Sequence, residues 1–210
     1  MLRLIASLAV GLALSACAYG DAKLNLAYDA GAAKPGLLSE APAARVDLKA
    51  VDDARVEKQA IGYKRNGFGA KTADILSATP PAEIVQDAIR VALEKNGHVI
   101  GGDSDRYAVK TTLNKFWFDY KTGLVSVEFF GSVQAEVSVV DKTTGQAIYT
   151  ELFDGYHSEK TGGGLKKTWT RIMNAAIADL AAKMTLSPGL KDALATAAAT
   201  PAAGGAVPNS

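Results

Sequence analysis

The strongest constraint on the fold is an alternating pattern over residues 125–139. The odd positions carry apolar or small side chains, and nearly all even positions carry Ser, Glu or Gln. A period of two is typical of a β-strand with one buried face. Strand-like runs flank this segment at 107–120 and 147–156, with turn sequences at 121–123 and 141–145. These runs predict three antiparallel strands joined in chain order as a meander.

Two further segments show the spacing of amphipathic helices. The first begins after Thr79-Pro80-Pro81 and repeats apolar residues every three or four positions until Asn96-Gly97, as expected of a helix with one buried face. The second carries a similar stripe over 165–184, with Trp169 and Ile177 expected in the core. The sequence therefore predicts an α+β fold, an antiparallel meander sheet with both amphipathic helices packed on one face.

The N-terminus has the pattern of a bacterial signal peptide. Arg3 precedes an apolar run over 4–14, which at about 11 residues is too short for a membrane-spanning helix of about 20 and fits a secretory signal. Cys17, the single cysteine, follows Leu14-Ser15-Ala16, and this segment resembles the lipobox of bacterial lipoproteins. The resemblance implies cleavage before Cys17 and diacylglycerol and palmitate chains on that residue. Because Ala18 follows, it also implies sorting to the outer membrane.

The sequence divides into four segments. Residues 1–16 are predicted to form the signal peptide. Residues 17–43, rich in Ala and Gly, are predicted to be a lipidated tether that is either flexible or partly extended against the domain. Residues 44–185 contain the predicted strands and helices and form the globular α+β domain. Residues 186–210 are rich in Ala and Pro and are predicted to be a disordered tail, with only a transient helix over 190–199.

Composition argues against several classes of function. With 23 Lys and Arg against 22 Asp and Glu, the chain lacks the basic excess that nucleic-acid binding requires. One cysteine and two histidines, His98 and His157, do not supply the ligands of a zinc site, so both histidines are expected to be surface or hydrogen-bonded side chains. The sequence contains no nucleophile or phosphate-loop motif. We therefore expect no metal, no cofactor, no nucleic-acid partner and no enzymatic activity.

The lipobox, the helix that ends Ala92-Leu93-Glu94-Lys95-Asn96-Gly97, the three long strands and the closing helix together resemble the YajG-like bacterial lipoproteins. The resemblance covers residues 44–184 and the lipobox. It implies a membrane-anchored, periplasm-facing lipoprotein without catalytic residues, which would act as a binding or assembly module for another component of the cell envelope. The same order of elements is similar to accessory lipoproteins of envelope transport systems, so the alternative function is binding of lipid or another apolar ligand.

The central hairpin carries apolar side chains on both faces. A three-residue turn at 121–123 would pair Trp117 with Val127 and Phe118 with Ser126. The face of Trp117 would then carry Val125, Val127 and Phe129, and the other face would carry Phe116, Phe118, Tyr120 and Phe130.

Two helices on one side of the sheet cannot cover both of these faces. The second cover is provided by the tether, by the loop at 64–72 or by a second copy of the chain, or else the aromatic side chains contact a partner or ligand. The candidate partner or ligand surface comprises Phe116, Trp117, Phe118, Tyr120 and Phe130.

Overall fold

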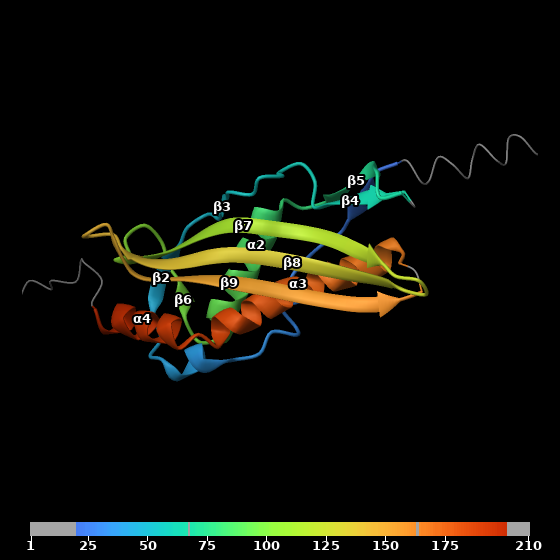
Figure 1. Cartoon of the computed structure of the whole chain (residues 1–210). Helices are drawn as coiled ribbons and strands as arrows, with labels where there is room; N and C mark the ends of the chain where they lie inside the picture. Colours follow the sequence, from blue (N-terminus) through green and yellow to red (C-terminus); the bar gives the residue numbers. More distant parts are fainter. Residues whose placement is uncertain (1–19, 67, 163, 201–210) are drawn as a thin grey trace, which may run out of the picture.

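Three long strands form the centre of the computed structural model, which describes residues 20–66, 68–162 and 164–200 (Figure 1). They are β7 (Tyr107–Thr122), β8 (Val127–Asp141) and β9 (Gln146–Thr161). Each pairs antiparallel with the next along the chain, so the predicted meander is confirmed. The predicted signal peptide and Cys17 lie outside the described residues.

The register of the central hairpin differs from the prediction. The turn occupies residues 123–126, where the Gly123 amide donates to the Ser126 carbonyl at 2.8 Å, and is not the three-residue turn at 121–123. Trp117 therefore pairs with Ser132 instead of Val127, and Phe118 pairs with Gly131 instead of Ser126. A shift of five positions is odd, and an odd shift exchanges the two faces of one strand relative to its partner.

Short strands extend the meander on the β7 side. The strand β2 (Arg45–Leu48) lies parallel between β7 and β6 (Val99–Ile100), which gives the order β6-β2-β7-β8-β9. The strand β3 (Asp52–Asp53) also pairs with β7 in parallel. The sheet is therefore mixed, with its antiparallel part formed by the three long strands.

A second, smaller sheet lies beside β7. Its strands are β1 (Ala22–Leu24), β5 (Lys71–Ser77) and β4 (Gly62–Arg65), in the order β1-β5-β4. The pair β4–β5 is an antiparallel hairpin, and β1 adds in parallel to β5.

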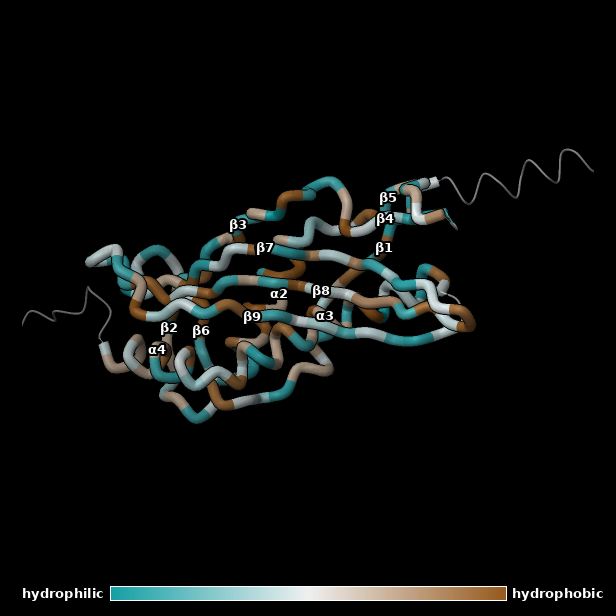
Figure 2. Tube along the Cα trace, viewed as in Figure 1, coloured by the Kyte–Doolittle hydropathy of each residue, from teal (hydrophilic) through white to brown (hydrophobic). Residues whose placement is uncertain are grey.

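The helices α2 (Pro81–Lys95) and α3 (Lys166–Thr185) pack on one face of the large sheet, as predicted (Figure 1). The trace of α3 in Figure 2 alternates between brown and teal, as an amphipathic helix requires. Ile177 of α3 is completely buried, together with Val133 and Val137 of β8. Trp169, at the N-terminal end of the same helix, is only partly buried against this core.

The prediction of a disordered tail from residue 186 is wrong for residues 188–199, which form a third helix, α4 (Pro188–Ala199). The Ser187 hydroxyl caps it by accepting from the Leu190 amide at 3.1 Å, and Pro188 suits the first helical position. Leu190 and Leu194 are fully buried. Because these apolar residues recur at helical spacing among alanines, the strongest helix formers, the segment folds against the domain.

Of the two forms predicted for the tether, the flexible one is wrong for the described part of residues 17–43, which lies against the domain. Ala22, Leu24 and Leu26 are buried while the residues between them are exposed, the pattern of a strand with one covered face. A short 3-10 helix, η1 (Leu37–Glu40), follows and buries Leu38. This segment belongs to the folded domain.

Candidate functional site

The residues of the predicted aromatic surface separate into two groups. Phe116 and Phe118 point to the helix side and are 1% and 0% exposed, so the prediction of an exposed surface is wrong for both. The ring of Phe118 lies 6.0 Å from that of Phe129 and 5.5 Å from that of Trp169. These side chains are core because the true register brings Phe129 onto their face and α3 covers it.

The hairpin of β4 and β5 provides the remaining cover at the edge of β7. Ile61 directly precedes β4, and its carbonyl accepts from the Phe118 amide at 2.6 Å. Tyr120 is half-buried, and its hydroxyl accepts from the Arg65 amide at 2.8 Å and donates to the Arg65 carbonyl at 3.2 Å. Of the alternatives left open above, cover by the loop at 64–72 therefore applies to Tyr120.

Trp117 and Phe130 lie on the opposite, outer face of the large sheet. Tyr156 of β9 joins them, because Ser132 pairs with both Trp117 and Tyr156. The rings of Phe130 and Tyr156 are 6.2 Å apart, and Tyr156 is 50% exposed. We call Trp117, Phe130 and Tyr156 the outer aromatic strip.

Neighbouring side chains hold the strip in place. The ring of Tyr63 on β4 contacts Trp117 edge-on, with centroids 4.9 Å apart. The Lys121 ammonium lies 5.5 Å from the centre of the Phe130 ring, within the range of a cation–π contact. Sequence reasoning missed Tyr63 and Tyr156. The alternation within 146–161 was the available signal for Tyr156, whereas nothing local links Tyr63 to Trp117.

A surface hollow of about 500 Å³ adjoins Trp117. Its walls are the loop at 55–57 and the outer side of β7 and β8, and its lining residues include Arg55, Val56, Glu57, Asn114, Lys115, Trp117 and Gln134. The Arg55 guanidinium is buried and binds the Asp53 carboxylate at 2.8 Å. The Tyr63 hydroxyl donates to Glu57 and lowers the pKa of that carboxyl. The loop is thus fixed at both ends, and the hollow is preformed.

The open edge of β9 is partly closed by α3. The Tyr156 amide donates to the Asp179 carboxylate at 2.9 Å, and the Lys183 ammonium donates to the Asp154 carbonyl at 2.7 Å. Exposed edge strands are templates for pairing with another chain. Because these backbone groups are already hydrogen-bonded, the middle of β9 is not available for pairing with another strand. A partner could contact it only through the side chains on the outer face.

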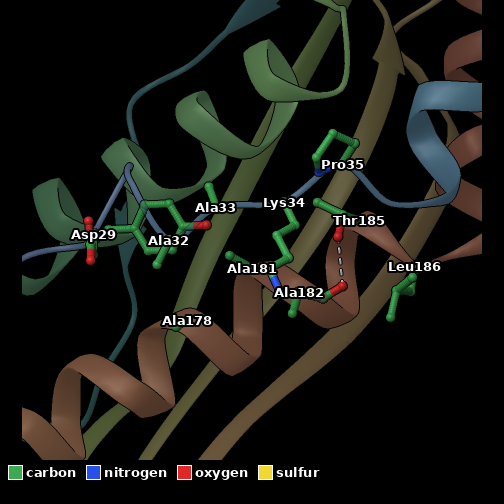
Figure 3. Close-up of a pocket in the computed structure, with 11 residues that line it drawn as sticks. Asp29, Ala32, Ala33, Lys34, Pro35, Ala178, Ala181, Ala182, Thr185 and Leu186 are labelled. Atoms are coloured by element: carbon green, nitrogen blue, oxygen red, sulfur yellow. Dashed lines mark hydrogen bonds between the residues drawn. The ribbon is translucent and has the colours of Figure 1, made fainter.

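A second hollow, of about 280 Å³, lies between residues 28–35 and the C-terminal half of α3 (Figure 3). Small side chains of α3, Ala178, Ala181 and Ala182, form one wall, and the Lys34 side chain extends towards them. The volume is at the lower limit of small-molecule sites, which span about 300–1,000 Å³. The outer aromatic strip with its adjoining hollow is therefore the stronger candidate site.

The contacts of the two histidines indicate structural roles and not a functional site. His98 is buried, and its Nδ1 accepts from the Ala44 amide at 3.2 Å while its Nε2 lies 3.2 Å from the Leu38 carbonyl. Burial lowers the pKa of His98, so the ring is neutral. His157 lies 3.2 Å from Glu159 on the same strand. In the described part of the chain, no three His, Cys, Asp or Glu residues gather as a metal site, and no helix is long and apolar enough to cross a membrane.

Comparison with known proteins gives a family and a fold. The family model described as "uncharacterized lipoprotein" matches residues 39–195. Protein XCC0632 from Xanthomonas campestris is similar in structure, with a TM-score of 0.56 and 8% identity over 82% of this chain and 94% of that chain. A minor lipoprotein from Acinetobacter baumannii has a TM-score of 0.44 and 14% identity over 69% of this chain and 90% of that chain.

At 8% identity, the similarity to protein XCC0632 is one of fold alone, and none of the curated proteins matches the chain in sequence. The match to the family model says more about this chain than the structural similarity does. It covers α2, the three long strands, α3 and most of α4, and its members are membrane-anchored lipoproteins of the envelope. The chain therefore belongs to the YajG-like family of bacterial lipoproteins.

Proposed function

We propose that this lipoprotein is a non-enzymatic binding module of the cell envelope that recognises a protein partner through the outer aromatic strip. Lipid on Cys17 anchors it, and the domain faces the periplasm from the outer membrane. Family membership and the lipobox residues around Cys17 support the anchor, and Ala18 supports the outer membrane.

The position of the strip is the observation that carries the proposal. Outer positions of a half-covered sheet are ordinarily polar, and the flanking positions Ser132 and Gln134 follow that rule. Three aromatic side chains on neighbouring strands break it. Aromatic residues are enriched in protein interfaces and contribute much of the binding energy there.

The surroundings favour a protein over an apolar ligand as partner. Polar groups lie among the rings, including the Gln134 amide, which donates to the Asp154 carboxylate at 2.8 Å. An aromatic centre bordered by polar side chains is the usual arrangement of a protein interface. Because the rings stand on hydrogen-bonded strands, binding requires little ordering of the backbone.

Site-specific photocrosslinking in living cells tests this function. A benzophenone amino acid at Tyr156 is expected to give a defined protein adduct, whereas the same group at Asp192, exposed on α4, is the matched control and is expected to give none. Adding Trp117→Ala to the Tyr156 probe should lower the adduct yield at least about tenfold. Equal adducts at both positions, or a yield unaffected by Trp117→Ala, would contradict the proposal. A phospholipid adduct would instead favour the transport-accessory function.

Metabolic labelling tests the anchor separately. A palmitate analogue is expected to label the native chain and not the Cys17→Ala variant, because Cys17 is the single cysteine. Equal labelling of both proteins would exclude lipidation at this residue.

A further inference from the structure

Five large apolar side chains of the described residues are at least 80% exposed. Val56 borders the hollow beside Trp117, and the other four lie at the tips of loops. Phe68 follows the strand β4 and is 98% exposed, Leu124 and Val125 in the β7–β8 turn are 105% and 94% exposed, and Leu165 before α3 is 80% exposed. In Figure 2 the tip of the β7–β8 turn is brown. Turns ordinarily carry Gly, Pro, Asn, Asp or Ser, so these apolar tips require an explanation outside the folding of the domain.

The tips lie at one end of the molecule. Val127 pairs with both Thr122 and Thr161, which places the β7–β8 turn beside the end of β9, from which the chain continues to Leu165. An ion pair between Arg65 and Asp119 brings the β4–β5 hairpin to the same end of β7. Figure 1 shows this hairpin, the β7–β8 turn and the start of α3 together on the right.

The described chain also begins at this end. The Lys64 ammonium donates to the Gly20 carbonyl at 2.6 Å, and the Asp74 amide donates to the Asp21 carboxylate at 2.9 Å. Only residues 18 and 19 separate Gly20 from Cys17. Three residue steps span at most about 11 Å, whatever path the chain takes. Cys17 is therefore within about 11 Å of Gly20, which lies at the same end of the molecule as the apolar tips (Figure 1).

The charges at this end suit a phospholipid surface. Lys121 and Lys160 are exposed near the ends of β7 and β9, and Lys166 and Lys167 are exposed at the start of α3. Within the described residues, Lys166 and Lys167 have no ion-pair partner. Lysine ammonium groups beside inserted apolar side chains meet the phosphate groups of lipids and strengthen attachment to anionic membranes.

We propose that Phe68, Leu124, Val125 and Leu165, the membrane-facing tips, insert into the phospholipid surface that holds the Cys17 lipid. The inference rests on the proposed anchor and adds an orientation to it. The three long strands then point away from the membrane, and the β8–β9 turn at their far end lies up to about 50 Å from it, since β8 has 15 residues at about 3.3 Å each. The outer aromatic strip faces sideways into the periplasm.

Depth measurements on the lipidated protein test the orientation. The protein is reconstituted in vesicles of phosphatidylethanolamine and phosphatidylglycerol, with one cysteine introduced as Leu124→Cys or, as the matched control, Thr144→Cys in the β8–β9 turn. A polarity-sensitive fluorophore on residue 124 should be quenched by lipids with brominated acyl chains at least threefold more strongly than on residue 144. Equal quenching at the two positions would overturn the proposal. Adding Leu165→Asp should at least halve the quenching at residue 124, whereas Ile148→Asp, near the other end of β9, should not.

The same samples separate the two proposals. In a lipidated chain the Cys17 sulfur is a thioether, so the protein without an introduced cysteine takes up no fluorophore and floats with the vesicles. If it floats but residue 124 is not quenched, the orientation is wrong and the anchor stands. If it takes up the fluorophore and does not float, the anchor is wrong and the orientation falls with it.

Discussion

Gly155 of β9 lies directly against the carbonyl oxygen of Ala176 on α3. A Cβ atom at residue 155 would overlap that oxygen and would stand 2.8 Å from the Cβ of Leu180. On the neighbouring strand, a Cβ at Gly131 would stand 2.9 Å from the sulfur of Met173. These two glycines let α3 approach the sheet across β8 and β9, which closes the core over the aromatic rings near Phe118.

We expect Gly155→Ala to destabilise the domain, because the added methyl group must displace α3 from the sheet. Overpacking of this kind costs about 1–3 kcal/mol. Gly102→Ala is the matched control, since a Cβ at residue 102 has no atom within 4 Å, and its free energy of unfolding should change little. Urea unfolding of both variants measures the difference, and equal stability would show that α3 is not held closely on β9.

Two adjacent residues of β7 test the division between core and surface. Phe118→Ser should lower the free energy of unfolding by at least about 3 kcal/mol, because Phe118 is fully buried and truncation of a buried Phe to Ala alone costs about 3–5 kcal/mol. Trp117→Ser, on the outer face of the same strand, should lower the free energy of unfolding much less and should weaken crosslinking to the proposed protein partner. If Phe118→Ser left thermal stability unchanged, the register of the hairpin would be wrong.

Periodicity was sufficient to predict the layers of this fold. The strands β7, β8 and β9 and the helices α2 and α3 repeat apolar residues with periods of two or near 3.6 over many positions, so local patterns and tertiary packing agree. The segments that were misassigned are short or rich in alanine. The helical spacing in α4 and the alternation around Ala22 are both present, but few large apolar side chains mark them.

The candidate site could be predicted only in part, because its faces depend on the length of one turn. Residues 121–123 and 123–126 are both plausible turns, but they differ by an odd shift in register, which decides whether Phe130 lies with Trp117 or opposite it. The contact between Tyr63 and Trp117 depends on tertiary structure and leaves no local signal. Conversely, the resemblance to a lipobox rests on sequence alone and stays a prediction, because Cys17 lies outside the described residues.

The helix α4 should contribute to stability in spite of its composition. Leu194→Ala is expected to cost about 2–5 kcal/mol, the range for truncating a buried Leu, because Leu194 is fully buried. Thr196→Ala, at an exposed position two residues further on, should be nearly neutral. Chemical denaturation checks both variants, and an unchanged midpoint for Leu194→Ala would mean that the helix is dispensable for the fold.

The stability of the domain should also depend on pH through the protonation state of His98. Its neutral ring joins the end of α2 to the N-terminal segment by accepting from the Ala44 amide and lying in hydrogen-bond range of the Leu38 carbonyl. A protonated Nδ1 would face the Ala44 N–H and could no longer accept from it. Because burial lowers the pKa of His98 in the folded state, the unfolded chain takes up the proton first as pH falls below about 6.5. Stability contributed by the neutral ring is therefore present above that pH and is lost below it.

We expect the urea midpoint of the native protein to fall between pH 7.5 and pH 5, and to fall less steeply in His98→Gln. The Gln amide can replace one hydrogen bond of the ring but does not titrate in this range. The comparison isolates His98, because every other ionisable group is the same in the two proteins. The proton uptake that accompanies unfolding sets the slope of stability against pH, so identical slopes for the two proteins would show that His98 is not the group that titrates.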